Sequence, residues 1–421
     1  MRLSLTRLAT LVFAIFTVWL TRRLHARAAR DPTSLFFNPR TGYAPRYSLV
    51  RRQQALDYIG SAQNTSISPA ASSSASPPPD KNLCVGIPSI ARPNGGYLAE
   101  TIGSLLSSLT PPERASIHLI VLIPHTTPSL HPSYAESWLH ILADDIVTYA
   151  DLPAPERDHI VHLEATDGPE YLTKGLFDYQ VVLQRCAAMH TPYIAVFEDD
   201  VVAMEGWYAR AMRAVERAEW KSAVKHASLE FLYLRLFYTE EFLGWNRESW
   251  GRYLFWSAGV WAVPMGLLLY LRERYPGLKA RGLSTRGMGL FAWGIVAVVG
   301  FYFALGRIAV SPLQEGVQLM QNFGCCSQAL VFPRGRALML ATYMAERGRG
   351  APDVLIEEYA NEKGELRWAV SPSLVQHIGR KSSKKDDFGE KSKYGMSVAE
   401  KIWSFGFEEW DPRILRDRGV A

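Results

Sequence analysis

Cysteine is scarce in this sequence. The 421 residues include four cysteines: Cys84, Cys186, Cys325 and Cys326. Four is too few for a small fold that depends on disulfides in place of a hydrophobic core, and no Cys-x-x-Cys pair marks a structural zinc site. Both of these protein classes are therefore excluded.

The sequence also lacks an excess of charge of one sign. It has 46 Lys and Arg against 41 Asp and Glu, a formal net charge of +5. This small excess over a long chain predicts no nucleic-acid partner. Hydrophobic residues make up 48% and charged residues 21%, which excludes a disordered protein and predicts one large domain or two ordinary ones with attachments.

Apolar residues are concentrated in three blocks, Leu3–Leu20, Leu254–Leu271 and Met288–Leu305. The second and third blocks are nearly free of charge and long enough to cross a bilayer, although two buried core helices are the alternative. Short basic loops stay on the cytosolic side of membranes. We therefore predict a transmembrane hairpin over 254–305 with a cytosolic loop, 272–287. The charges of this loop are Arg272, Glu273, Arg274, Lys279, Arg281 and Arg286.

The first apolar block is read either as a membrane anchor or as a cleaved signal peptide. Arg22 and Arg23 follow it directly, whereas signal peptides carry their charge on the other flank, so we predict a retained anchor over 1–24. With the hairpin loop in the cytosol, most of the chain is lumenal, which suits the sequon that begins at Asn64. Short spans fit the thinner membranes of the early secretory pathway.

The remaining chain divides by composition. Residues 61–80 are rich in Ser and Pro, as flexible linkers are, so 25–80 is predicted to be a stem and linker. A folded domain is then expected in two parts, 81–253 and 306–421 with a tail, on either side of the hairpin.

Apolar runs alternate with segments of helical spacing after residue 81. Strands are predicted over Leu83–Ile87, Ile117–Ile123, Ile160–Leu163 and Tyr193–Phe197, and helices over Gly96–Leu109, Tyr134–Val147 and Phe177–Met189. Strands and helices in alternation predict an α/β fold with a largely parallel sheet. Such sheets bind ligands at the carboxyl ends of their strands.

Three consecutive acids follow the strand Tyr193–Phe197: Glu198, Asp199 and Asp200. Three buried carboxylates need neutralisation or coordination, and their hard oxygen atoms suit Mn or Mg, which also bind the diphosphate of a nucleotide-sugar. Acids at strand ends are common as helix caps as well, so the residues alone leave both interpretations open.

The string Phe197–Val201 resembles the DXD element of GT-A glycosyltransferases. Ser228–Phe231, Asp353–Ile356 and Pro372–Gly379 with Ser382 and Ser383 resemble the N-acetylglucosaminyltransferase IV family in order and spacing. A catalytic domain split by two tandem spans, with a Glu-Asp-Asp element and a Gly-Cys-Cys stretch, is similar to the GPI-N-acetylgalactosamine transferase family. The resemblance covers roughly residues 81–412.

This resemblance implies a multi-pass Golgi enzyme with a lumenal catalytic domain. Its expected reaction moves a hexosamine, GalNAc above all, from a UDP-sugar to the mannose of a GPI glycan with inversion. The expected partners are GPI-anchored proteins or the GPI glycolipid, together with membrane lipid. An N-glycan branching transferase and a non-enzymatic membrane scaffold remain as alternatives.

The resemblance also implies roles for individual residues. Asp200 and His377 are the predicted metal ligands, with Glu198 and Asp199 in support, although a lone histidine at a strand end is more often only hydrogen-bonded. Local explanations compete for the other positions: turn chemistry for Asp167, and solvent exposure for Lys174 and Arg380. The predicted contacts with the uridine, the sugar or the diphosphate are Val85, Gly86, Pro88, Asp167, Lys174, Cys325, Cys326 and Arg380.

An inverting transferase needs a carboxylate, away from the metal, that takes the proton of the acceptor hydroxyl. Asp353 is ranked first as this base, with helix capping as its alternative. Glu230 is the second candidate or an acceptor contact, with an ion pair to Arg235 as its alternative. Cys325 and Cys326 are candidates for a vicinal disulfide. Cys84 and Cys186 form either a second disulfide or two buried thiols.

Overall fold

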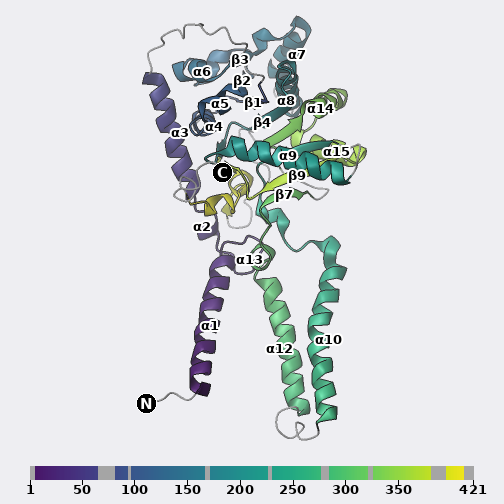
Figure 1. Cartoon of the computed structure of the whole chain (residues 1–421). Coiled ribbons are helices and arrows are strands. Elements are labelled where there is room, and N and C mark those ends of the chain that lie inside the picture. The colour runs from purple at the N-terminus through teal and green to yellow at the C-terminus, as the bar shows by residue number, and fades with distance from the viewer. Residues whose placement is uncertain are drawn as a thin grey trace. The chain divides into compact units, whose positions relative to one another are not determined.

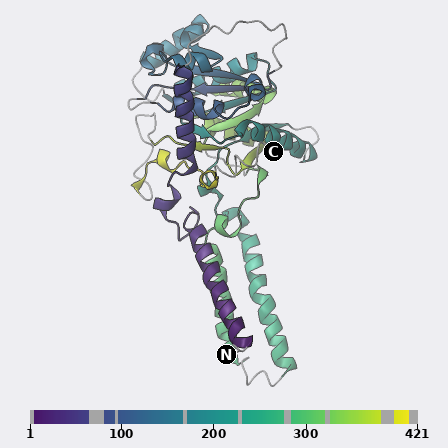
Figure 2. The same ribbon diagram turned by 60° about the vertical axis from the view of Figure 1, so that its left-hand side comes forward.

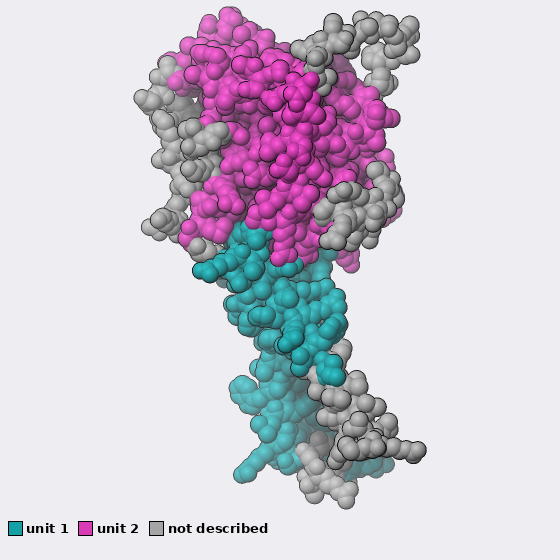
Figure 3. Space-filling view, turned by 90° about the vertical axis from the view of Figure 1, so that its left-hand side faces the viewer, with its two compact units in different colours: residues 1–44, 240–313 teal, residues 45–239, 314–421 magenta. Residues whose placement is uncertain are grey.

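A computed structural model describes most of the chain (Figures 1 and 2). The chain forms two compact units, residues 1–44 with 240–313 (unit 1) and residues 45–239 with 314–421 (unit 2), which are coloured separately in Figure 3. The described residues are 5–64, 81–92, 96–165, 171–225, 230–275, 284–320, 326–380 and 395–411.

Unit 2 is built on an eight-stranded sheet of order β3-β2-β1-β4-β8-β6-β9-β7. The pairs β1–β2, β1–β4, β2–β3 and β6–β9 are parallel, whereas β8 runs antiparallel to β4 and β6, and β7 to β9. The sheet is therefore mixed. Its strands are β1 (Leu83–Pro88), β2 (Ile117–Ile123), β3 (Asp145–Thr148), β4 (Tyr193–Phe197), β6 (Phe231–Arg235), β7 (Gly316–Leu319), β8 (Ala329–Pro333) and β9 (Leu366–Ser371). A separate antiparallel ribbon pairs β5 (Val201–Ala203) with β10 (Val375–His377).

Helices cover both faces of this sheet, as Figures 1 and 2 show. Alternate residues of β1 enter opposite cores: Val85 packs with α3, α4, α6 and α9, and Cys84 with α7, α8, α14 and α15. This layering confirms the α/β class, although the sheet is mixed rather than largely parallel. The helices of unit 2 are α3 (Tyr47–Asn64), α4 (Leu98–Leu106), α5 (Pro111–Ala115), η1 (Pro128–Leu130), α6 (Ser137–Leu142), η2 (Tyr149–Asp151), α7 (Ala154–Ala165), α8 (Tyr171–Ala188), α9 (Trp207–Lys225), α14 (Arg334–Arg347), α15 (Pro352–Lys363), α16 (Val398–Lys401) and η6 (Phe407–Glu409).

Two predicted elements are wrong. Of the helix predicted over Tyr134–Val147, only Ser137–Leu142 (α6) is helical, and its last three residues belong to the edge strand β3 (Asp145–Thr148). The strand over Ile160–Leu163 lies inside helix α7. There Ile160 and Leu163 are buried while Val161 is 48% exposed, which is the three-residue spacing of a helix face rather than the alternation of a strand.

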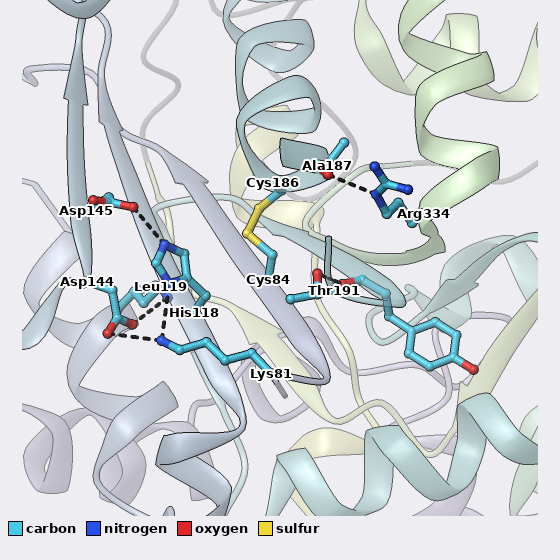
Figure 4. Close-up of a disulfide and its surroundings, with 11 residues drawn as sticks. Lys81, Cys84, His118, Leu119, Asp144, Asp145, Cys186, Ala187, Thr191 and Arg334 are labelled. Carbon is cyan, nitrogen blue, oxygen red and sulfur yellow. Dashed lines mark hydrogen bonds and ion pairs between the residues drawn. A yellow bond between two sulfur atoms is a disulfide. The ribbon is translucent and has the colours of Figure 1, made fainter. Parts of the chain in front are cut away.

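A disulfide joins the sheet of unit 2 to the helices on one of its faces. Cys84 of β1 is bonded to Cys186 of α8 (Figure 4), so of the two alternatives for these cysteines the disulfide is correct. Gly86 lies two residues along β1, and a Cβ atom there would be 2.2 Å from Cγ1 of Val182 on α8. Strand and helix therefore approach more closely than any other residue at position 86 allows.

Unit 1 consists almost entirely of helix. Two of its helices, α10 and α12, are long and apolar enough to cross a membrane, and only 6% of the most apolar window of each is buried. This exposure contradicts the alternative of two core helices and fits contact with lipid. The elements of unit 1 are α1 (Leu5–Ala28), α2 (Pro39–Gly42), η3 (Glu240–Leu243), η4 (Arg247–Ser249), α10 (Trp250–Arg274), α12 (Thr285–Ala304) and α13 (Arg307–Val310).

The buried carboxylate of Asp31 joins the end of α1 to the segment after α12. Its Oδ2 accepts the N–H of Ala309 at 2.8 Å, and its Oδ1 accepts the N–H and the hydroxyl of Thr33. Ala28, Leu305 and Ala309 form a small core at the same place. The C-terminal ends of α1 and α12 therefore lie together within unit 1.

Helix α3, which the sequence analysis did not anticipate, belongs to unit 2. Arg51 of this helix is buried and donates to the carbonyls of Ala203 and Ser104, both at 2.8 Å. At Gly103 of α4, a Cβ atom would lie 2.4 Å from the carbonyl oxygen of Ala55 on α3. The two helices therefore meet backbone to backbone.

This close approach predicts that Gly103→Ala lowers the stability of unit 2 by about 1–3 kcal/mol, since the added methyl group pushes against backbone rather than a mobile side chain. Gly60→Ala on α3 is the matched control, because no atom lies within 4 Å of its Cβ position. Alanine at this helical position should be neutral or stabilising by up to about 1 kcal/mol. Thermal unfolding of the purified protein in detergent measures both. Equal midpoints for the two variants would contradict the packing of α3 on α4.

Candidate active site

Three acids lie where β4 ends and the ribbon β5–β10 begins. Glu198 follows β4, and Asp199 and Asp200 precede β5. The register pairs His377 with Val201 and so brings His377 next to Asp200. The hydroxyl oxygen of Thr101 lies 2.8 Å from the carbonyl oxygens of both Asp199 and Val201, and the N–H of Ile378 donates to the carbonyl of Asp200 at 2.8 Å. The backbone of the acid triplet is thus held from both sides.

Both carboxylate oxygens of Asp199 have partners within the protein. Oδ1 accepts from a guanidinium nitrogen of Arg92 at 2.5 Å, and Oδ2 accepts from the hydroxyl of Ser89 at 2.6 Å. Burial raises the pKa of Asp199, an effect that the positive charge of Arg92 opposes. Asp199 is therefore saturated by the chain itself.

Asp200 differs because one of its oxygens has no hydrogen-bond partner among the described residues. Its Oδ2 lies 3.1 Å from a guanidinium nitrogen of Arg92 and 3.4 Å from Nε2 of His377, whereas its buried Oδ1 has no hydrogen-bond partner within the described part of the chain. Burial alone would raise the pKa of Asp200, but the charges of His377 and Arg92 outweigh it and hold that pKa well below its usual range. Asp200 is thus an anion with one unused oxygen.

The ring of His377 is oriented by the backbone. Nδ1 lies 3.0 Å from the carbonyl oxygen of Ile402, which can only accept, so Nδ1 carries a proton and Nε2 points at Asp200. Burial lowers the pKa of His377, but the negative charge of Asp200 outweighs this and the net shift is upward. Gly379 lies against both side chains, since a Cβ there would be 2.2 Å from Oδ2 of Asp200.

This donor set matches a cation that takes the rest of its ligands from a substrate. Among the described residues, no three His, Cys, Asp or Glu side chains gather closely enough to hold a metal by themselves. The Oδ1 of Asp200, unpartnered among the described residues, is a carboxylate oxygen of the type that Mn and Mg take, and Nε2 of His377 could join it once that nitrogen has lost its proton. A divalent ion with one or two protein ligands and several phosphate oxygens is the usual arrangement at phosphate sites.

Glu198 points to a second set of residues. Its carboxylate accepts from the hydroxyl of Ser327 at 2.8 Å and from the side-chain amide of Gln328 at 3.3 Å. Burial of the carboxyl group, followed by the negative charge of Asp200, raises the pKa of Glu198 to about 7. Cys326, directly before Ser327, is buried and disulfide-bonded, and its carbonyl accepts from buried Arg235.

Asp353 lies in the first turn of α15, where its Oδ1 accepts the N–H of Val354 at 3.0 Å. Its charge acts on Glu198, Arg235 and Tyr179, so the structure brings Asp353 into the neighbourhood of the triplet. The hydroxyl of Tyr179 is buried and has no hydrogen-bond partner among the described residues, and burial raises its pKa. Tyr179 was not among the predicted site residues.

Glu230 lies at the opposite end of the strands from the acid triplet. Strands β4 and β6 both run antiparallel to β8, and Val196 and Arg235 pair with the same residue, Leu330. Glu230 precedes β6 whereas Glu198 follows β4, so roughly 20 Å of strand separates them. The side chain of Glu230 is 68% exposed and pairs with Arg336 at 3.5 Å. This position does not support the predicted role of Glu230, nor its pairing with Arg235, which instead pairs with Glu357.

Five further predicted contacts lie within the described residues. Val85 and Gly86 are buried within β1, and Gly86 serves the packing of α8. Lys174 contacts the carbonyl of Pro124 at 2.7 Å, Asp178 at 3.2 Å and Glu164 at 3.7 Å. Pro88 ends β1 next to Ser89, and the N–H of Arg380 donates to the hydroxyl of Tyr97 at 3.4 Å. Asp167 and Cys325 lie outside the described residues.

Sequence reasoning missed the positive charge of the site. Arg92 bridges Asp199 and Asp200, and its guanidinium lies 5.3 Å from the ring centroid of Tyr97. The sequence offers one signal: Arg92 follows the first predicted strand by a few residues, and loops after parallel strands meet at the ligand-binding edge of the sheet. That signal does not tell which acids an arginine will pair with.

Comparison with protein families identifies the family of this chain. The family model described as GPI-N-acetylgalactosamine transferase PGAP4 matches residues 83–376. The chain belongs to this family. The match begins with β1, includes the acid triplet, the two apolar helices and Asp353, and ends in β10 next to His377. It confirms the family resemblance and supports a role as a GPI-N-acetylgalactosamine transferase.

A second buried ionic group lies near the carboxyl ends of β2 and β3. Asp178 accepts from the hydroxyl of Tyr149 at 2.5 Å and from Lys174 at 3.2 Å. Burial raises the pKa of Asp178 from 3.8 to about 6, although the charge of Lys174 opposes this shift. The folded protein therefore keeps a proton on Asp178 to a higher pH than the unfolded chain does.

This shift predicts that Asp178 costs stability as the pH rises. Below the unfolded pKa both states are protonated, and between the two pKa values ionisation favours the unfolded chain. Relative to Asp178→Asn, which has no carboxyl to titrate, the wild type should lose about 2 kcal/mol between about pH 4.5 and about pH 7. Thermal midpoints of both proteins across this range measure the difference. A midpoint difference that does not change with pH would contradict the raised pKa.

Proposed function

We propose that this protein transfers N-acetylgalactosamine from a UDP-sugar to the mannose of a GPI glycan, with inversion at the anomeric carbon, on the lumenal side of Golgi membranes. Family membership supports the reaction class and the acceptor. The observation that carries the proposal is the unused Oδ1 of Asp200, an anionic oxygen at the end of β4 among positive side chains. The parallel strands β1 to β4 and this acid triplet support a GT-A-type domain.

The donor is proposed to bind through its diphosphate at Asp200 and His377. These two side chains would hold Mn or Mg, and the phosphate oxygens would supply the other ligands. The ion would neutralise charge that develops on the leaving diphosphate. Arg92 adds a fixed positive charge next to both aspartates. Arg380, Asp167, Cys325 and Cys326 remain predicted donor contacts.

Asp353 is the proposed general base. In an inverting transfer, the mannose hydroxyl oxygen bonds to C1 of the donor sugar while the bond from C1 to the diphosphate oxygen breaks. UDP leaves with the electron pair, and the hydroxyl proton passes to the carboxylate of Asp353. Asp353 stands on α15, apart from Asp200 on the β4–β5 connection, so that a cation at Asp200 does not occupy it.

The membrane helices fit a lipid-linked acceptor. We propose that α1, α10 and α12 span the bilayer with loop 272–287 in the cytosol. Under this topology α12 ends on the lumenal side, and because Asp31 joins the ends of α12 and α1, α1 ends there too. A GPI glycan lies close to the lipid surface, so an enzyme fixed in the membrane at this point meets its acceptor with less loss of entropy.

The experiment that tests this function uses the full-length protein in detergent or nanodiscs. It is incubated with a GPI-anchored acceptor and a panel of UDP-GalNAc, UDP-GlcNAc and UDP-galactose, with Mn or with EDTA. We expect UDP release and the addition of one N-acetylhexosamine to the GPI glycan, dependent on metal. Asp200→Ala, and Gly379→Ala, whose methyl group would push against Oδ2 of Asp200, should both lose this activity. Transfer to an N-glycan instead would favour the branching enzyme, and a folded protein that turns over no UDP-sugar would refute the transferase.

The assignment of the base predicts different results for Asp353→Asn and Glu230→Gln. Asparagine keeps an oxygen for the N–H of Val354 but is not basic, so kcat should fall by about 100-fold or more while UDP binding is unchanged. Glu230→Gln should keep nearly full activity, because its side chain is exposed at the far edge of the sheet. The reverse pattern of kcat values would make Glu230 the base.

A further inference from the structure

A chain of hydrogen bonds through two buried side chains ends on the acid triplet. Neither side chain is a predicted donor contact. The chain of hydrogen bonds starts at the N–H of Ser133, passes through His131 and Ser89, and ends on Asp199. Ser89 and His131 are each only 1% exposed. The backbone N–H of Ser89 donates to the carbonyl of Leu122 at 2.9 Å, which fixes this residue to the end of β2.

The donor and the acceptor of each hydrogen bond in this chain can be assigned. The N–H of Ser133 donates to Nδ1 of His131 at 3.2 Å, so Nδ1 is unprotonated and the ring proton is on Nε2. Nε2 lies 3.0 Å from the hydroxyl oxygen of Ser89, and the Ser89 hydroxyl lies 2.6 Å from Oδ2 of Asp199. Because a carboxylate can only accept, Ser89 donates to Asp199, and its oxygen accepts from His131.

The environment of His131 keeps it neutral. Burial, and then the nearby His125, lower the pKa of His131 to about 4, so that the ring carries one proton at neutral pH. A neutral ring fixed as the Nε2–H tautomer is the donor that the Ser89 oxygen needs. Hydrogen bonds that point the same way polarise and strengthen one another in a buried site.

The chain of contacts continues beyond Asp199. Its other oxygen holds Arg92 at 2.5 Å, and the same guanidinium reaches Asp200 at 3.1 Å. If the Ser89 hydroxyl rotates away, Asp199 loses one of its two side-chain partners and Arg92 loses a fixed anchor. The position of Asp200, the acid with the unused oxygen, then changes as well.

We propose that His131 is a positioning residue of the donor site, which acts through Ser89 to fix Asp199, Arg92 and hence Asp200. The residue does not touch substrate. This inference rests on the proposed function for its assay but concerns residues that the sequence analysis did not single out. It predicts that loss of His131 weakens binding of the UDP-sugar more than it slows the chemical step.

A double-mutant cycle tests the proposal on full-length protein with UDP-GalNAc as the donor and UDP as a binding probe. Ser89→Ala and His131→Leu should each raise KM and the Kd of UDP by about tenfold, with a smaller change in kcat. The double variant should be no worse than Ser89→Ala alone, because His131 acts only through Ser89. His131→Gln, which can still donate to Ser89, should recover most of the binding. His140→Leu, on the exposed side of α6, is the matched control and should match the wild type.

Additive losses in the double variant would overturn the proposal, since a merely structural histidine contributes independently of Ser89. If His131→Leu does not fold, Ser89→Ala and His131→Gln decide: weak UDP binding by the first and normal binding by the second support the proposal, and the opposite result overturns it. A wild type that binds UDP but turns over no sugar would refute the proposed function without touching this inference, because the binding cycle is read independently of turnover.

Discussion

Three adjacent carboxylates at the end of one buried strand are the constraint around which unit 2 is arranged. Burying a carboxylate without partners costs several kcal/mol or more. Each carboxyl group therefore needs hydrogen-bond or ionic partners, or it takes up a proton because its pKa is raised. The partners come from distant parts of the chain: Arg92 after β1, His377 at the end of β10, and Ser327 before β8. The order of strands in the sheet, with β4 between β1 and β8, brings Arg92 and Ser327 to the end of β4, and the separate pairing of β10 with β5 brings His377 there.

The sequence pattern was sufficient to predict those parts of the site that lie within one short segment of the chain. The apolar run of β4 followed by the acid triplet, and the short apolar stretch that ends at His377, are visible in the sequence. Their juxtaposition depends on the pairing of β5 with β10, for which the sequence has no short-range signal. The family resemblance supplied this juxtaposition, because it names His377 and Asp200 together.

Partner choice is what the sequence could not predict. Lys174 was expected to contact the diphosphate. In the structure it forms an ion pair with buried Asp178, which lies one helical turn along α8. Gly86 was expected to contact the uridine of the donor. In the structure, its lack of a side chain makes room for Val182 of α8. Glu230 was expected near the acceptor because it lies in an apolar run, yet the run is a strand whose N-terminal end faces away from the triplet. In all three cases the sequence left open which neighbour the residue meets, and that is decided by strand direction and helix packing.

The position of the two apolar helices in the sequence follows from the same sheet. The chain leaves unit 2 after β6 and re-enters it before β7. β7 is a four-residue strand at the outer edge of the sheet, paired with β9. The two central neighbours of β6, namely β8 and β9, form after the return, so the inserted helices interrupt the sequence without interrupting a strand. Loop-closure entropy grows slowly with length, and both ends of the insertion remain tied to the sheet. An insertion of this kind therefore leaves the acid triplet intact while it adds two long apolar helices to the chain.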